Sequence, residues 1–158
     1  MHEAKQETKK TNQRNSFRFA ERCLFEFQAN RARLEALQDE RAFLYKVGSV
    51  KAQNYDPSHG GGYPSDAVSA RLERLEKLDE EIRRLEGRVK PLERLLGDLE
   101  SPCVLEDSPR KELLKIMQLY YFGENVWRAV AGELHLGRSA FFERRAWLVR
   151  LAIRYLGL

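Results

Sequence analysis

Residues 66–100 carry a heptad repeat, and this feature most restricts how the 158-residue chain can fold. Aliphatic residues occupy nine of the ten seam positions in this register, and Arg71 occupies the tenth. The seam consists of Val68, Leu75, Ile82, Val89 and Leu96 at position a and of Leu78, Leu85, Leu92 and Leu99 at position d. A helix with such a repeat buries its seam by pairing with another helix. The chain is therefore predicted to contain a long helix with a helical partner.

The stretch from Ser16 to Val47 can supply that partner, because its apolar residues recur at steps of three or four and predict one amphipathic helix. The Gly- and Pro-rich residues 48–65 then predict a loop in which the chain reverses. The apolar stripe of this helix contains Cys23, Phe27, Leu34, Leu37 and Leu44, interrupted by Asn30 and Arg41. Two geometries satisfy the pattern: an antiparallel hairpin within one chain, and a homodimer paired through helix 66–100.

The composition favours helices throughout, with 10 glycines and 5 prolines in the whole chain. Pro91 lies inside the repeat, and because proline lacks an amide proton and crowds the preceding turn, a kink or break is expected near residues 87–90. The predicted fold class is all-α, with a long, coiled-coil-like helical hairpin at residues 16–100 followed by a three-helix module. Residues 1–15 are polar and aperiodic, which predicts a disordered basic arm.

Positive charge is concentrated near the C-terminus. Residues 108–158 contain nine Lys or Arg and four Glu, a net charge of +5, and a linker at residues 101–107 precedes them. A basic module of this kind suits a polyanionic partner. The chain has no apolar run of the roughly 20 residues needed to cross a bilayer, and its start lacks the apolar core of a signal peptide. We therefore expect a cytoplasmic protein that does not contact membranes.

Catalytic and metal-binding classes find little support in the sequence. The histidines His2, His59 and His135 are scattered over a tail, a loop and a turn, and there is no phosphate-binding GxxxxGK motif. Cys23 and Cys103 lie far apart without metal-ligand spacing. The protein is therefore expected to be no enzyme and to hold no cofactor or metal.

Three short helices are predicted in residues 108–158. The first runs from Pro109 to about Phe122 and ends at Gly123; the second, capped by Asn125, spans Val126 to Leu134; the third opens near Gly137 or Ser139 and runs to Leu156. Val126 is predicted to face inward, and Trp127 is predicted to pack toward the first helix. A helix-turn-helix needs a small residue where its helices approach and an apolar residue in the turn. Ala131 and Leu136 occupy those places.

This stretch resembles a known family. VWRAVAGELHLGRSAFFERR resembles the helix-turn-helix of sigma-70 region 4, and LLKIMQLYYFGENVW resembles the helix that leads into it. The last third of the chain is thus similar to sigma-like and ArpU-like transcriptional regulators of bacteriophages and integrated elements. The resemblance implies a module at residues 108–158 that binds double-stranded DNA. It also implies a possible contact of RNA polymerase with the apolar and basic end of the third helix.

By that resemblance the third helix, residues 139–156, lies in the major groove. The residues expected to contact bases are Arg138, Ser139, Phe142 and Glu143, and those expected to contact phosphates are Lys111, Arg128, Arg144 and Arg145. Two departures from the family pattern bear on the base contacts. Gly137 replaces the usual Ser cap, and Glu143 stands where an arginine is common, which lowers the positive potential of the reading face.

The function expected from these observations is sequence-specific DNA binding by a transcriptional regulator, encoded by a phage or mobile element. Two alternatives stay open. A small terminase-like DNA-packaging protein also combines a helix-turn-helix with oligomerising helices. A coiled-coil adaptor or scaffold would use its C-terminal helices only to dock a partner protein.

Overall fold

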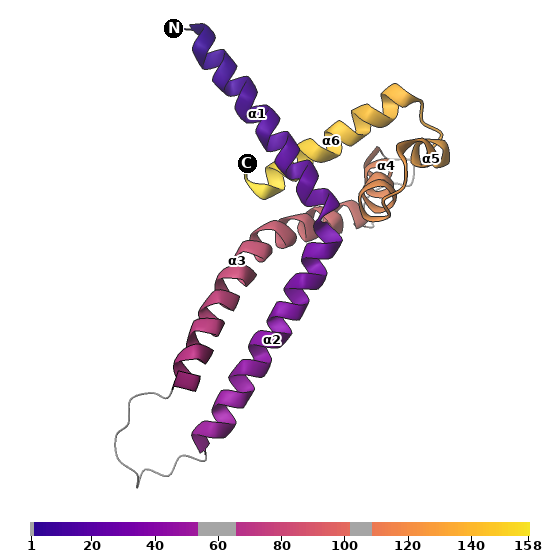
Figure 1. Ribbon diagram of the computed structural model, residues 1–158. Coiled ribbons are helices and arrows are strands. Elements are labelled where there is room, and N and C mark those ends of the chain that lie inside the picture. The colour runs from indigo at the N-terminus through magenta and orange to yellow at the C-terminus, as the bar shows by residue number, and fades with distance from the viewer. Residues whose placement is uncertain (1, 54–65, 102–108) are drawn as a thin grey trace. The chain divides into compact units, whose positions relative to one another are not determined.

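The computed structural model describes residues 2–53, 66–101 and 109–158. These residues form six α-helices and one π-helical segment and include no strand, so the predicted all-α class is confirmed. In chain order the elements are α1 (His2–Phe25), α2 (Phe27–Gln53), α3 (Asp66–Glu100), α4 (Pro109–Ile116), η1 (Met117–Phe122), α5 (Trp127–Glu133) and α6 (Arg138–Leu156) (Figure 1).

The helices form two compact units. Unit 1 contains Met1–Gln28 and Gly87–Leu158, and unit 2 contains Ala29–Glu86. The predicted division between residues 16–100 and 108–158 does not match these units, because α1 packs against η1 and α6. Apart from Ser101, the predicted linker lies outside the described residues, as does the greater part of the predicted loop.

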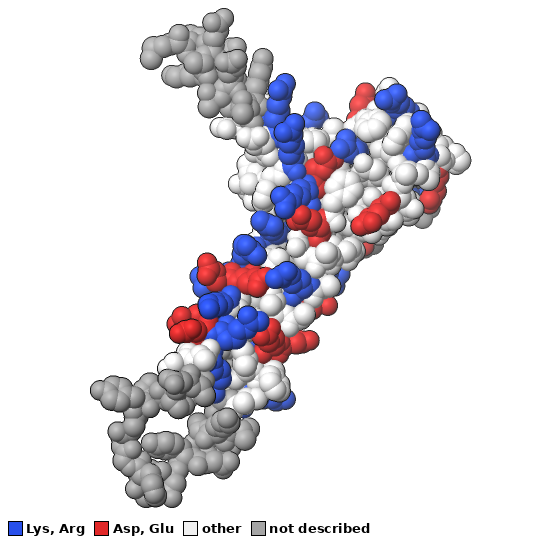
Figure 2. All heavy atoms as spheres, viewed as in Figure 1, with Lys and Arg blue, Asp and Glu red and all other residues white. Residues whose placement is uncertain are grey.

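Unit 2 is an antiparallel hairpin of α2 and α3 (Figure 1). Arg33 pairs with Glu81 at 2.5 Å, whereas Glu40, farther along α2, pairs at 2.7 Å with Arg74, an earlier residue of α3. Because residues later in α2 pair with residues earlier in α3, the two helices run antiparallel. Figure 2 shows acidic and basic side chains interleaved along the visible face of this hairpin. Of the two geometries left open by the sequence, the intrachain hairpin is the one found.

The seam of the hairpin is filled from within the chain. Its buried side chains are Leu34 and Leu37 of α2 and Leu75, Leu78, Ile82 and Leu85 of α3. Because α2 covers this part of the seam, the seam is closed within the chain. The homodimer through helix 66–100 stays a prediction. Val68, predicted at a seam position, is 40% exposed.

Of the kink or break predicted near residues 87–90, a break is not found, because α3 continues through Pro91 to Glu100. A proline inside a helix costs about 3 kcal/mol. Val89, Leu92 and Leu95 on either side of Pro91 are each 1% exposed. Full burial of one such side chain stabilises a fold by about 1.5–3 kcal/mol, so their packing outweighs the lost hydrogen bond. Leu95 is buried in place of the predicted Leu96.

The N-terminal helices also differ from the prediction. Because α1 begins at His2, residues 2–15 are helical and do not form the expected disordered arm. The single helix predicted over residues 16–47 is interrupted at Glu26, whose amide still donates to the Arg22 carbonyl oxygen at 2.9 Å. The next helix, α2, runs past Gly48 to Gln53. Ala20, Cys23 and Leu24 are buried and give α1 an apolar face.

In unit 1, α1 crosses α6 (Figure 1); α4 packs against α6 and η1, and η1 packs against α1. The buried interior of α4, η1 and α6 comprises Leu113, Ile116, Met117, Tyr121, Phe141, Leu148, Val149 and Ala152. The predicted end of the first module helix at Gly123 is confirmed, although its last six residues are π-helical. A methyl group at Gly123 would lie 2.9 Å from the Leu119 carbonyl oxygen, which explains the glycine there.

Candidate nucleic-acid interface

The turn between α5 and α6 is where the sequence predicts the turn of a helix-turn-helix. Residues 134–137 join the two helices. The His135 amide donates to the Gly132 carbonyl oxygen at 3.1 Å, and the Leu136 amide donates to that of Ala131 at 2.8 Å. This pair of bonds closes a Schellman motif, in which the residue after the helix is left-handed, and His135 has φ 53°. The motif ends α5 and redirects the chain into α6.

Two residues were predicted to pack at this turn, a small residue in the first helix and an apolar residue in the turn, and both are at least partly buried. Ala131 is 4% exposed and Leu136 is half-buried. The predicted cap of α5 is wrong: Val126 holds the cap position, and the Asn125 side chain instead donates to the Leu119 carbonyl oxygen at 3.0 Å. Val126, expected to face inward, is 70% exposed.

The Trp127 ring makes a cation–π contact with one arginine of α5 and one arginine of α6. The guanidinium carbon of Arg128 lies 5.6 Å from the centroid of the Trp127 ring, and that of Arg138 lies 5.9 Å from it. The ring itself packs on Phe141 and Phe142 of α6, with centroid distances of 6.1 and 5.4 Å. We call Trp127, Arg128 and Arg138 the tryptophan platform. It holds one exposed cation on α5 and another at the start of α6, and each cation–π contact contributes about 0.5–1 kcal/mol.

The four residues predicted to contact bases divide into two kinds. Arg138, Ser139 and Glu143 are exposed on the first two turns of α6. Phe142 is half-buried, and its ring packs edge-to-face on Phe141 with a centroid distance of 5.4 Å. Its place suits support of the tryptophan platform better than contact with a thymine methyl group. The sequence could not separate these roles, because Phe141 and Phe142 are adjacent aromatic residues.

The four residues predicted to contact phosphates are also unequal. Arg128 is exposed, whereas Lys111 is half-buried and already has an interaction partner. Arg144 forms an ion pair with Glu112 of α4 at 2.6 Å, and its guanidinium carbon lies 6.0 Å from the ring centroid of Trp147. Arg128 is therefore the one of the four best placed for a phosphate contact.

Arg145 belongs to the interior of unit 1. It forms an ion pair with Glu21 of α1, and the two side chains are only 21% and 18% exposed. Tyr121 of η1 donates its hydroxyl to the same Glu21 oxygen at 3.1 Å. This arrangement engages Arg145 within unit 1 and does not favour the phosphate role predicted for it. The sequence could not predict this ion pair, because Glu21 lies 124 residues away from Arg145 in a different helix.

The protonation states of this cluster follow from its surroundings. Burial, reinforced by the neighbouring Glu21 carboxylate, raises the pKa of the Tyr121 hydroxyl well above its ordinary value. Burial alone would lower the pKa of Arg145, but its interactions with neighbouring side chains, among them the ion pair with Glu21, outweigh burial and the pKa is raised. The cluster thus holds a neutral tyrosine beside a charged ion pair, which joins α1, η1 and α6.

The part of the chain that the structure describes contains no cluster of three or more His, Cys, Asp or Glu side chains able to hold a metal ion. None of the described helices is both long and apolar enough to span a bilayer. Comparisons of the chain with models of protein families, with curated proteins and with solved structures found no significant match.

Proposed function

We propose that this protein is a sequence-specific DNA-binding transcriptional regulator that places the start of α6 in the major groove of a duplex. The observation that carries the proposal is the tryptophan platform at the α5–α6 turn, which presents two exposed arginines beside exposed Ser139 and Glu143. An α-helix fits the major groove of B-form DNA, and its first residues then reach the base edges.

Each exposed side chain has a chemical role in this proposal. Arg138 donates two hydrogen bonds to a guanine edge, and Glu143 accepts one from a cytosine amino group. Ser139 donates to or accepts from a neighbouring base. Arg128 contacts a phosphate, and the Phe142 ring packs against the Trp127 ring and holds it in place. The proposal leaves Arg145 to hold the fold, and Arg144 remains paired with Glu112.

The predicted contact with RNA polymerase is a separate proposal and rests on the exposed part of the α6 end. Leu148, Val149 and Ala152 are buried within unit 1 and cannot contribute to it. Any polymerase contact would involve the outward side of this helix, which includes exposed Arg150 and Arg154.

In vitro selection from a library of random duplexes tests DNA binding directly. The full chain is expected to enrich one motif, and fluorescence anisotropy then compares the selected duplex with a scrambled one of equal length. Arg138→Ala should weaken binding to the selected duplex by about 5- to 150-fold, the usual effect of losing one bidentate base contact. It should also relax the preference for one base pair. Arg128→Ala should weaken binding to both duplexes equally and reduce the salt slope by about one.

Arg94→Ala is the matched control, because Arg94 is an exposed arginine of unit 1 that belongs to α3 and not to α5 or α6. Its affinity for both duplexes should equal that of the unchanged chain. Recovery of no motif, together with no duplex binding at low salt by a folded chain, would refute the proposal and favour the adaptor or scaffold function. A motif whose recognition survives Arg138→Ala would place the reading face elsewhere.

A further inference from the structure

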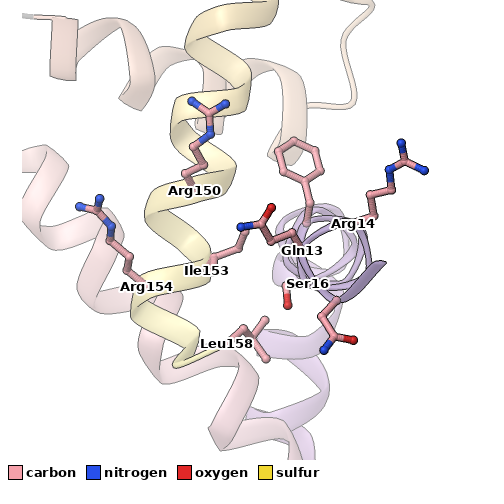
Figure 3. Close-up of a pocket in the computed structure, with 9 residues that line it drawn as sticks. Gln13, Arg14, Ser16, Arg150, Ile153, Arg154 and Leu158 are labelled. Carbon is pink, nitrogen blue, oxygen red and sulfur yellow. The ribbon is translucent and has the colours of Figure 1, made fainter. Parts of the chain in front are cut away.

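A groove of about 770 Å³ lies in unit 1 between α1 and the end of α6. Phe17 of α1 and Ile153 and Leu158 from the other side give it an apolar lining. In Figure 3, Ile153 and Leu158 point toward α1, where Gln13 and Ser16 lie opposite them. The groove is far from the turn that joins α5 and α6. Arg138 and Arg154, at the two ends of α6, are 16 residues apart, about 24 Å along a helix axis.

Three arginines surround this groove. Arg14 comes from α1, and Arg150 and Arg154 come from successive turns of α6. All three side chains are exposed, and none of them forms an ion pair with another described residue. Figure 3 shows Arg14 and Arg154 extending to opposite sides, so positive charge flanks the apolar lining. The described residues that line the groove include no Asp or Glu.

We propose that this groove binds an acidic amphipathic segment of a partner protein. The apolar lining takes up aliphatic or aromatic side chains of the segment, and the flanking arginines pair with its carboxylates. Arg150 and Arg154 are one helical turn apart, which matches carboxylates spaced by four residues on a bound helix. Arginine is suited to this role because its planar guanidinium binds a carboxylate through two parallel hydrogen bonds.

The lining distinguishes this partner from a nucleic acid. A phosphate backbone gains nothing from Ile153 and Leu158, whereas a peptide gains about 25 cal/mol for each Å² of apolar surface that it buries. The two ends of α6 would then bind different partners, with DNA at its start and a protein segment at its end. The groove proposal does not rest on DNA binding, because it uses other residues.

A peptide-display selection on the full-length protein provides the test. The library consists of random 18-residue peptides, and we expect enriched sequences with apolar residues at helical spacing and at least two flanking Asp or Glu. A fluorescein-labelled copy of an enriched peptide then serves as the probe in anisotropy measurements. Arg150→Glu/Arg154→Glu should weaken its binding at least tenfold. The control Arg94→Glu, an exposed charge reversal on α3 in the same unit, should leave the peptide affinity unchanged.

A charge-swapped peptide separates a direct contact from a folding defect. The same peptide with Lys in place of its Asp and Glu should bind the reversed double variant more tightly than it binds the unchanged protein. Enrichment of neutral or basic peptides only, or of none, would overturn the proposal, as would an acidic peptide whose affinity survives the double reversal. Displacement of the peptide by duplex DNA, with equal loss of duplex affinity in the double variant, would instead identify the groove as a nucleic-acid surface.

Discussion

Replacing Glu21 with glutamine tests the attachment of α1 to the helices that carry the proposed reading face. Glu21→Gln keeps the size of the side chain and an acceptor for the Tyr121 hydroxyl, but it removes the negative charge opposite Arg145. Arg145 then stays partly buried without its counter-charge. The expected result is a less stable unit 1 with an unchanged fold.

The magnitude follows from the exposure of the pair. A hydrogen bond to a charged group contributes about 1.5–3 kcal/mol, and removal of one partner from a fully buried ion pair costs about 3–5 kcal/mol. Here Arg145 and Glu21 retain 21% and 18% exposure, so water offsets part of the loss. We expect the free energy of unfolding to fall by about 2 kcal/mol, about 30-fold in the equilibrium constant.

Tryptophan fluorescence in urea measures this change selectively. Both tryptophans of the chain, Trp127 and Trp147, lie in unit 1, so their signal follows that unit and not the hairpin. Arg22→Gln is the matched control: it removes the ion pair of Arg22 with Glu26, in which the Arg22 side chain is 72% exposed. An exposed pair of this kind contributes little to stability because water screens it, so the control transition should move little.

A double variant completes the reasoning. Arg145→Met added to Glu21→Gln removes the uncompensated charge and should restore part of the lost stability, because a well-packed apolar pair is often as stable as a buried ion pair. A loss below about 0.5 kcal/mol for Glu21→Gln, a size common among exposed pairs, would contradict the role assigned to the pair in holding α1.

Three further predictions use the same denaturation assays. His135→Gly should stabilise unit 1 by about 1 kcal/mol in the fluorescence assay, because glycine adopts the left-handed conformation at φ 53° without strain. Leu78→Ala should destabilise the hairpin by about 2–5 kcal/mol in circular dichroism, while the tryptophan transition stays in place, since Leu78 is 1% exposed in unit 2. Burial raises the pKa of the Cys23 thiol and of the Tyr121 hydroxyl, so the unfolded chain loses these protons first. Their contribution to stability is therefore fully present below pH 9.0, the ordinary pKa of the thiol, and should fall as the pH rises beyond it; equal stability at pH 8 and pH 10.5 would contradict this.

Periodic packing was the most predictable part of this fold. The leucine seam of α3 predicted its length and the need for a partner, and α5 and α6 begin and end within two residues of their predicted bounds. The continuity of α3 through Pro91 was not predictable, because it depends on how well Val89, Leu92 and Leu95 are packed by other parts of unit 1. Local propensity therefore predicted a kink or break, whereas tertiary packing keeps the helix continuous.

The sequence predicted which residues lie at the candidate interface better than it predicted the role of each one. Arg138, Ser139 and Glu143 lie exposed where the helical spacing puts them. Arg145 follows Arg144 directly and looks equivalent in the sequence, yet it turns inward because Glu21 and Tyr121 supply a charged partner and a polar neighbour. The sequence near Arg144 and Arg145 does not reveal that α1 lies beside Arg145. Without that knowledge, the different surroundings of the two arginines cannot be predicted.

Unit 1 draws its residues from both sides of the hairpin in the sequence, and this has a consequence for protein engineering. A chimera that carries only residues 109–158 would lose α1 and uncover apolar side chains of α6, and Arg145 would lose Glu21. A graft that keeps residues 1–28 together with 87–158, closed by a short connection, would preserve these contacts. The hairpin, by contrast, can be shortened by removing one heptad from α2 together with the heptad of α3 that faces it. The seam residues that remain on the two helices then still pack against one another.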